Sequence, residues 1–345
     1  MKEYREIAKR LETETGVVLT RRFAGTEGGL SSMERTILGK ADAAGLAKEA
    51  LEQGLPVLQR GEDSWEAAEP FFPKERLIVL GGGHVALPVV EFGAKIGFLV
   101  TVVDDRLSFA NPGRFPLAEQ VVCDSFSHAI EQLAITESDY VCILTRGHRY
   151  DADCLRQICQ GKEPAYLGMI GSRRRVGIVK ETLLAEGVDA GRLERLKSPI
   201  GLPIGGVTPE EIAVSIVAEI IQVKRLSRED KRTRNRSDVD FDVLKRLAEE
   251  TEEPKAVVTV LESKGSSPRG AGAKMIVYRD GRILGSIGGG CSEAAVLGQA
   301  RRLIGSGRYQ VIHVDLGGEA AEDEGMVCGG VMDVLVEDYP AGEPV

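Results

Sequence analysis

Residues 77–106 read LIVLGGGHVALPVVEFGAKIGFLVTVVDDR, and this stretch indicates the fold class. Leu77–Leu80 is a short, fully apolar run, as expected of a strand buried on both faces of a parallel sheet. A helical apolar pattern follows it, and a second apolar run, Leu99–Val103, ends in Asp104. Strand, glycine turn, helix, strand and acidic residue in this order predict a Rossmann-like, doubly wound α/β domain.

The turn between the first strand and the helix has the chemistry of a phosphate site. A G-x-G-x-x-A spacing begins at Gly81. Glycines let the backbone approach a pyrophosphate, which binds the unpaired N–H groups of the helix N-terminus, and an acidic residue after the second strand can accept hydrogen bonds from a ribose. We therefore predict that Gly81, Gly82, Gly83, His84 and Asp104 bind a cofactor. A tight turn that binds nothing is the alternative.

Composition limits the classes of function. The chain has 345 residues, 43% of them hydrophobic and 28% charged, which is typical of a globular protein with two or three domains. The formal net charge of −9 argues against sequence-independent binding to nucleic acid. No apolar run approaches the roughly 20 residues of a membrane span, and the start MKEYREIAKRLE is no signal peptide. We expect a cytoplasmic protein with neither membrane nor nucleic acid as a partner.

Strands and helices alternate beyond the opening stretch, as in a doubly wound sheet. Further strands are expected at Val121–Cys123, Tyr140–Leu144 and Tyr166–Ile170. Thr208 and Glu211 form a capping box at the start of a closing helix with a continuous apolar stripe. We divide the chain into an N-terminal α+β segment (1–75), a Rossmann-type domain (76–224), a charged linker (225–240) and a smaller α+β domain (241–340).

The loops after the predicted strands carry unusual polar residues. In an open parallel sheet these loops emerge at one edge, where ligands bind. Three arginines that begin a helix at 173 face its partial positive charge, which a bound anion would relieve. We expect at least one of the three to point into solvent instead. The loops predict a site for an anionic, phosphate-bearing ligand, to which we add Arg106, Thr145, Arg146, His148, Gly171, Ser172 and Arg173.

Two of the six cysteines stand beside glycine-rich bends in the last domain. Cys291 follows three glycines at the start of a predicted helix, where the dipole favours the thiolate and lowers its pKa. Cys328 precedes Gly329 and Gly330, and small-residue packing is the alternative there. The other four cysteines are expected to be mostly buried, and no C-x-x-C pair or zinc spacing occurs.

The N-terminal segment has a pattern that returns near the end of the chain. REIAKRLETETGVVLT begins at Arg5, and DVLKRLAEETEEPKAVVT begins at Asp242. Both predict a helix, an acidic turn and a strand. We interpret this as a diverged internal duplication whose first copy lacks the cysteine and most glycines. Chance similarity between two helix–strand segments is the alternative.

Many motifs of residues 76–339 resemble the XdhC/CoxI family, accessory proteins of xanthine dehydrogenase and related molybdenum hydroxylases. GSSPRGAGAKM, GSIGGGCSEAAV and MVCGG resemble its CoxI-type domain. LIVLGGGHVA, VTVVDDR, FANPGRFP, LTRGHRYD, YLGMIGSRRR, SPIGLPIGG and TPEEIAVSIVAEI resemble its Rossmann-type domain. The usual order is reversed, because the recognisable CoxI-type copy comes last. Residues 1–75 would be a degenerate copy in the usual place.

The resemblance implies a maturation factor more than a turnover enzyme. Such a protein binds molybdenum cofactor (molybdopterin, in a simple or dinucleotide form), supports its sulfuration and delivers it to the hydroxylase. Its partners would be a xanthine dehydrogenase-type hydroxylase and a sulfur donor such as a cysteine desulfurase. Cys291 would bind molybdenum or carry sulfur, with Cys328 a second candidate. The CoxI-type motifs add Ser267, Arg269, Gly288, Gly289 and Gly290 as cofactor-binding residues.

Two other classes of function stay open. An NAD- or FAD-dependent oxidoreductase would also use the glycine turn and Asp104, with His84 or His148 as a general acid. A regulatory protein that senses a nucleotide would bind it without affinity for a pterin. The residues do not distinguish NAD, FAD and the nucleotide part of the molybdenum cofactor. We expect a homodimer.

Overall fold

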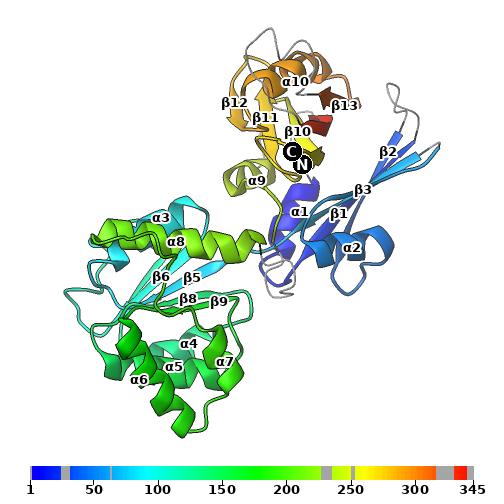
Figure 1. Cartoon of the computed structure of the whole chain (residues 1–345). Coiled ribbons are helices and arrows are strands. Elements are labelled where there is room, and N and C mark those ends of the chain that lie inside the picture. The colour runs from blue at the N-terminus through cyan, green and yellow to red at the C-terminus, as the bar shows by residue number, and fades with distance from the viewer. Residues whose placement is uncertain are drawn as a thin grey trace. The chain divides into compact units, whose positions relative to one another are not determined.

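The computed structural model describes residues 2–24, 32–62, 64–226, 235–249, 253–315 and 330–339 (Figure 1). The chain divides into two compact units. One unit combines Met1–Pro73 with Arg234–Val345, and the other is Lys74–Thr233. Among the described residues, no helix combines the length and the apolar character that a membrane span requires.

The second unit is built on a five-stranded parallel sheet. Its strand order is β7-β6-β5-β8-β9, so the chain runs outward from β5 in both directions. This confirms the predicted Rossmann-like, doubly wound sheet. The strands are β5 (Arg76–Leu80), β6 (Leu99–Asp104), β7 (Gln120–Cys123), β8 (Tyr140–Ile143) and β9 (Tyr166–Met169).

Helices cover both faces of this sheet (Figure 1). One face packs against α3 (Ala86–Lys95) and α8 (Pro209–Leu226). The other face packs against four helices, namely α4 (Phe126–Leu133), α5 (His148–Gln160), α6 (Arg173–Ala185) and α7 (Ala190–Arg195). Because both faces are covered, the central strands are mostly apolar, which is why they were recognisable in the sequence.

Helix α8 begins as the sequence predicts. The Thr208 hydroxyl accepts a hydrogen bond from the Glu211 N–H at 3.3 Å. The Glu211 carboxylate accepts one from the Thr208 N–H at 3.1 Å in return. This reciprocal capping box satisfies N–H groups that have no partner inside the helix.

The first unit contains two antiparallel sheets. The N-terminal half orders its strands β2-β1-β4-β3, and the C-terminal half orders its strands β12-β11-β10-β14-β13. The N-terminal half contains α1 (Lys2–Arg10), β1 (Val17–Ala24), β2 (Ser32–Gly39), α2 (Gly45–Gln53), β3 (Val57–Arg60) and β4 (Ser64–Phe71). The C-terminal half contains α9 (Phe241–Ala248), β10 (Lys255–Lys264), β11 (Lys274–Tyr278), β12 (Ile283–Gly285), α10 (Gly290–Leu303), β13 (Tyr309–Asp315) and β14 (Val331–Tyr339).

The two sheets of this unit share one core. Val17 and Leu19 of β1 pack in one cluster with Val257 of β10 and Ile276 of β11. Helices α2 and α10 each pack on their own half, in separate clusters. The described residues between 2 and 73 therefore form one layer of the first unit.

Residues 235–240 differ from the predicted linker. Asn235 and Ser237 are buried, and the Asp238 N–H donates to the Ala271 carbonyl at 3.1 Å. The Asp240 side chain caps α9. This end of the expected linker is therefore part of the C-terminal half, because its polar groups satisfy the loop that precedes β11.

Candidate functional site

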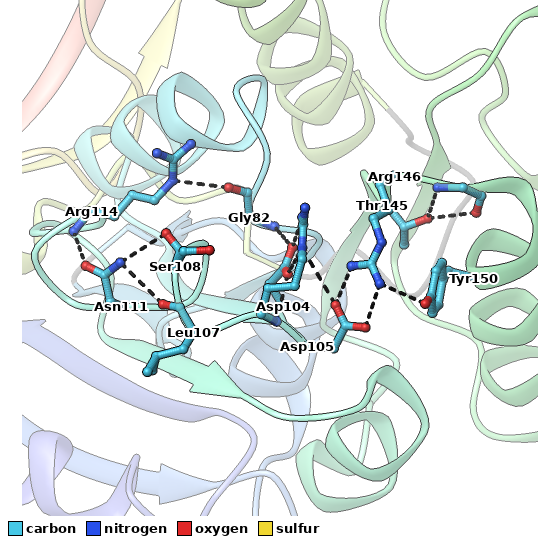
Figure 2. Close-up of polar contacts among 12 residues, drawn as sticks. Gly82, Asp104, Asp105, Leu107, Ser108, Asn111, Arg114, Thr145, Arg146 and Tyr150 are labelled. Atoms are coloured by element: carbon cyan, nitrogen blue, oxygen red, sulfur yellow. Dashed lines mark hydrogen bonds and ion pairs between the residues drawn. The ribbon is translucent and has the colours of Figure 1, made fainter.

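The carboxyl ends of the parallel strands carry the loops that we predicted to bind a phosphate-bearing ligand. We call the loops that follow β5, β6, β8 and β9 the ligand edge. Gly81 follows β5, Asp105 follows β6, Thr145 lies two residues beyond β8, and Gly171 lies two residues beyond β9. Figure 2 shows Asp104 and Asp105 between Gly82 and Arg146 at this edge.

The three glycines of the turn have different roles. Gly81 has a φ of +115°, and a Cβ atom there would lie 2.4 Å from the Leu144 carbonyl oxygen. A Cβ atom on Gly82 would lie 2.4 Å from the Phe109 carbonyl oxygen. A Cβ atom on Gly83 would meet nothing within 4 Å. Gly81 and Gly82 are thus required for packing, whereas Gly83 faces the open side where a ligand could approach the backbone.

Asp104 holds the glycine turn in place. Its carboxylate accepts hydrogen bonds from the Gly82 N–H at 2.8 Å and from the Arg106 guanidinium at 2.8 and 2.9 Å (Figure 2). The side chain is only 2% exposed. Burial raises the pKa of Asp104, but the hydrogen bonds from Arg106 and Gly82 lower it more, so its pKa lies below its ordinary value. A ribose could reach this carboxylate only after Arg106 moves, so the ribose contact stays a prediction.

A second ion pair links the loops after β6 and β8. The Arg146 guanidinium contacts both carboxylate oxygens of Asp105, at 2.5 and 2.9 Å, and donates to the Tyr150 hydroxyl at 2.7 Å. The hydrogen bonds to Asp105 raise the pKa of Arg146. The Arg106 guanidinium lies 3.6 Å from the centre of the Phe109 ring. Arg106 and Arg146 therefore both have partners within this unit.

Thr145 and the last of the three arginines are held by a buried acid. The Thr145 hydroxyl lies 2.5 Å from one carboxylate oxygen of Asp151, and Arg175 forms an ion pair with the other. The Asp151 side chain is fully buried. Asp151 of α5 thus connects the β8 loop to α6. His148 is the first residue of α5, and its side chain lies outside the described part of the chain.

Three arginines of the ligand edge, Arg114, Arg173 and Arg174, have N–H groups without a described hydrogen-bond partner. The Ser172 hydroxyl caps α6 by accepting from the Arg175 N–H at 3.3 Å. Arg173 and Arg174 are exposed and make no described hydrogen bond or ion pair. Arg114 donates from Nε to the Gly82 carbonyl at 3.2 Å (Figure 2), while its Nη2 is buried with no hydrogen-bond partner among the described residues. The edge thus offers unpaired donors to an anion.

Arg114 is the main residue of this edge that we did not select from the sequence. It belongs to the motif FANPGRFP, and the Asn111 side chain accepts a hydrogen bond from its N–H at 3.0 Å. Its distance of 32 residues from Gly82 hides the contact in the sequence. The motif alone could have pointed to it.

The CoxI-type residues lie in the other unit. Arg269 donates to the Asp238 carboxylate at 2.6 Å, and the Ser267 hydroxyl donates to the Arg269 carbonyl at 2.8 Å. The same Asp238 oxygen accepts from the Gly270 N–H at 3.0 Å. In this arrangement Ser267 and Arg269 stabilise their own loop, and their cofactor-binding role stays a prediction.

The glycine loop before α10 is filled by a carboxylate of its own chain. One oxygen of Glu293 accepts from the Ser286 hydroxyl at 2.6 Å and from the N–H groups of Ile287 and Gly289 at 3.2 and 3.0 Å. Gly288, Gly289 and Gly290 have φ values of +136°, +70° and +54°, which only glycine adopts readily. Ligand binding to these N–H groups stays a prediction.

The two predicted thiols are described only in part. The backbone of Cys291 lies in the first turn of α10, at the predicted position, but its side chain lies outside the described part of the chain. Cys328 also lies outside it. Cys142 and Cys154 are buried as expected, and burial raises the pKa of both thiols, whereas Cys123 is exposed. Among the described residues, no group of three or more His, Cys, Asp or Glu side chains could hold a metal ion.

The donor set of the ligand edge fits an anionic group. It combines the open backbone at Gly83, the unpaired Nη2 of Arg114 and the exposed Arg173 and Arg174. Backbone N–H groups at a helix N-terminus and guanidinium groups are the donors that proteins use for phosphate.

Comparison with known proteins identifies related sequences and structures. A family model described as the XdhC Rossmann domain matches residues 77–220, and one described as the XdhC and CoxI family matches residues 248–315. A solved structure named as a xanthine dehydrogenase from Bacillus halodurans is 25% identical, with a TM-score of 0.50. That likeness covers 63% of this chain and 65% of the other.

Three curated proteins share shorter stretches. The uncharacterized protein YqeB of Escherichia coli (strain K12) is 36% identical over 152 residues, which are 44% of this chain and 28% of YqeB. A probable xanthine dehydrogenase subunit of Bacillus subtilis (strain 168) is 31% identical over 153 residues, 44% of each chain. The molybdenum cofactor insertion chaperone PaoD of E. coli (strain K12) is 35% identical over 91 residues, 26% of this chain and 28% of PaoD.

The matched stretches span less than half the length of each of these curated relatives. The two family models, in contrast, match separate stretches that together cover more than half of the 345 residues. One of these stretches forms the parallel-sheet unit, and the other lies in the C-terminal half of the antiparallel unit. The chain therefore belongs to the XdhC and CoxI family.

Proposed function

We propose that this protein is a maturation factor for a molybdenum hydroxylase of the xanthine dehydrogenase type. It binds molybdenum cofactor, holds it while its sulfido ligand is installed, and delivers it to the hydroxylase. The structural support for this proposal is the set of hydrogen-bond donors at the ligand edge, namely the backbone at Gly83 and the guanidinium groups of Arg114, Arg173 and Arg174. The names of two relatives support it, one a molybdenum cofactor insertion chaperone and the other part of a probable xanthine dehydrogenase.

The ligand edge would hold the phosphate end of the cofactor. Molybdopterin carries a phosphate, and its dinucleotide form carries a pyrophosphate. The backbone at Gly83 would contact these oxygens, and the buried Nη2 of Arg114 would gain the acceptor that it lacks. Arg173 and Arg174 would add positive charge from the start of α6. A desolvated guanidinium without an acceptor costs free energy, so its pairing favours binding.

Cys291 is the proposed contact with the metal end of the cofactor. Molybdenum is thiophilic, and a cysteine in the first turn of a helix has its thiolate stabilised by the helix dipole. The thiolate would either bind molybdenum or carry the sulfur that a cysteine desulfurase supplies. Cys328 is the second candidate for the same role.

The first experiment is an anaerobic titration of the purified protein with molybdenum cofactor, followed by metal and pterin analysis of the recovered protein. We expect stoichiometric retention by the parent protein and its loss in Cys291→Ala. Equal retention and equal transfer to an apo-hydroxylase by Cys291→Ala would rule out the role of this thiol. No retention by the parent protein would rule out the cofactor proposal.

A second variant tests the phosphate end separately. Gly83→Ala places a methyl group on the open side of the turn, where it meets no atom of the protein within 4 Å. We expect the fold to be unchanged and cofactor affinity to fall by about tenfold or more, which is ~1.4 kcal/mol. Gly161→Ala at the far end of α5, whose Cβ atom would make only one ordinary contact at 3.8 Å, is the matched control. If Gly83→Ala bound the cofactor as tightly as Gly161→Ala, the phosphate would not contact the backbone at Gly83.

The strand order β7-β6-β5-β8-β9 supports a second candidate function, binding of NAD or FAD by an oxidoreductase or a nucleotide sensor. This order places Gly81 at the point where the chain reverses direction across the sheet, which is where dinucleotides bind. The engagement of Asp104 by Arg106 weighs against the usual ribose contact. Calorimetric titration with NAD and FAD tests it, because micromolar binding without any pterin affinity would favour this candidate.

We further propose a homodimer, in which the CoxI-type part of one protomer serves the Rossmann-type unit of another. Sedimentation velocity of the purified protein tests this. A species of twice the chain mass is expected, and a monomer across the whole concentration range would contradict it.

A further inference from the structure

The two halves of the antiparallel unit have the same architecture. Within the described residues, each half runs helix, two strands, helix and two strands, if the short edge strand β12 is left aside. The order β2-β1-β4-β3 in the first half corresponds to β11-β10-β14-β13 in the second. All neighbouring strands of both sheets are antiparallel. Helices α1 and α9, which open the two halves, are in contact.

The strand registers define which residues correspond. Leu19 of β1 faces Ile37 and Glu69 on its two neighbours. Val257 of β10 faces Ile276 and Glu337. Glu69 and Glu337 therefore occupy the same position in the two halves.

The same reasoning gives a second pair of equivalent positions. Arg21 faces Arg35 across β1 and β2, and Thr259 faces Lys274 across β10 and β11. Arg21 lies two positions after Leu19 along β1, and Thr259 lies two positions after Val257 along β10. Arg35 and Lys274 are therefore equivalent cations.

The equivalent charges pair across the two halves. Lys274 of the second half contacts Glu69 of the first half at 2.7 Å. Arg35 of the first half contacts Glu337 of the second half at 2.9 Å. Each half thus gives its cation to the carboxylate of the other, which is the reciprocal pattern of a twofold interface between two like subunits.

Arg21 lies between the two carboxylates. Its guanidinium contacts Glu69 at 2.9 Å and Glu337 at 3.4 Å, and it donates to the Tyr4 hydroxyl at 3.2 Å. Arg21, Glu69, Lys274 and Glu337 are at most 1% exposed. Burying four charges is costly unless each one is paired, so the pairing constrains how the halves fit together.

We propose that residues 2–71 are a second copy of the CoxI-type half, retained as its dimerisation partner within the same chain. The surface formed by β10, β11, β14 and α9 accordingly fits a second copy of its own fold, and the N-terminal half occupies it here. This proposal is independent of the cofactor that the protein binds.

The starts of α2 and α10 also correspond, and they differ where the chemistry would be. Gly45 begins α2 with a φ of +51°, and Gly290 begins α10 with a φ of +54°. The next residue is Leu46 in the first half and Cys291 in the second. The two halves together therefore have one cysteine at this helix start, whereas two identical subunits would have two.

Double-mutant cycles in the intact chain test the reciprocal pairing. Lys274→Met with Glu69→Gln removes one crossed pair, and Arg35→Met with Glu337→Gln removes the other. Each single variant should lower the urea midpoint of unfolding, and each double variant should lower it by less than the sum of its singles. The surface pair Lys95→Met with Glu91→Gln, on α3, is the control that should be additive. A crossed pair as additive as this control would overturn the proposal.

Cleavage of the full chain tests the fit of a second copy. Protease sites are inserted after Pro73 and within residues 227–234, and the folded protein is then cut. Fragments 1–73 and 234–345 should co-elute, and 234–345 separated from its partner should form a dimer that Lys274→Glu abolishes. Separation of the two fragments, or a monomeric 234–345, would overturn the proposal. Should that fragment aggregate, the cycles in the intact chain decide.

Discussion

Asp104 and Gly82 connect the glycine turn to the strand beside it. The carboxylate accepts from the Gly82 N–H on one side and from Arg106 on the other, while Arg114 donates to the Gly82 carbonyl. Both polar groups of the Gly82 backbone are thus satisfied by side chains. The turn is held in its shape before any ligand binds, which lowers the ordering cost of binding.

The ionised form of Asp104 stabilises the fold, and Asp104→Asn tests this. Because the folded pKa is depressed below the ordinary value of about 3.9, the contribution is present above that pH and is lost as the pH falls through the folded pKa. At pH 7 we expect Asp104→Asn to lose about 1–3 kcal/mol of unfolding free energy, from urea titrations. The difference from the parent protein should shrink as the pH falls below about 3.9, because the stabilising ionised form is then lost.

Glu91→Gln is the matched control for this pH series. Glu91 pairs with Lys95 on the exposed surface of α3, where an ion pair contributes at most about 0.5 kcal/mol. A difference for Asp104→Asn that stays constant from pH 7 to pH 2 would contradict the assigned role of the carboxylate.

At the residue level the sequence predicts positions better than partners. Gly81, Asp104, Thr145 and Arg146 lie at one edge because strand order alone places them there. Their hydrogen bonds could not be predicted, because they depend on side-chain directions in loops. Arg114 was missed for the same reason.

At the level of elements, α8 shows that a helix can be predicted from the sequence where it has both a capping box and a continuous apolar stripe. Its start at Pro209 follows from Thr208 and Glu211, and its buried residues, among them Ile216 and Ile220, follow from the apolar spacing. The central parallel strands β5, β6 and β8 were equally clear because both of their faces are buried.

The strands that escaped prediction are those with mixed patterns. SMERTILG (β2), SWEAAEPF (β4) and YQVIHVD (β13) carry charged or polar residues inside the strand. In β4 the buried carboxylate Glu69 is paired with Lys274, more than 200 residues away. Such pairs across the two halves make a buried acid look like a surface residue in the sequence.

The capping box of α8 should contribute measurably to the stability of the parallel-sheet unit. Thr208→Ala removes the hydroxyl that accepts from the Glu211 N–H and should cost about 0.5–2 kcal/mol in urea unfolding. Amide exchange in the first turn of α8 should also accelerate. Thr208→Ser keeps the hydroxyl, so it should retain most of the stability. If Thr208→Ser were as destabilised as Thr208→Ala, the methyl group and not the cap would be responsible.

At the scale of the whole molecule, the chain order and the spatial order differ. The parallel-sheet unit, Lys74–Thr233, is inserted between two sequence segments that fold together as the other unit. Length and composition could not predict this, because a boundary between adjacent segments and an insertion have the same appearance in sequence. The similarity between the segments at Arg5 and Asp242 was the one signal of it.

Because each unit has its own hydrophobic clusters, we expect the two units to unfold as separate cooperative transitions. Two matched substitutions test this. Ile216→Ala removes a fully buried side chain of the parallel-sheet unit, and Ile276→Ala removes one of the antiparallel unit. Each should cost about 2–5 kcal/mol, because a cavity remains in a packed core. Peptide-resolved hydrogen exchange across a urea series should show the loss only in the unit that carries the substitution. If either variant destabilised both units equally, the chain would unfold as one cooperative body, and the division into two units would describe its contacts but not its energetics.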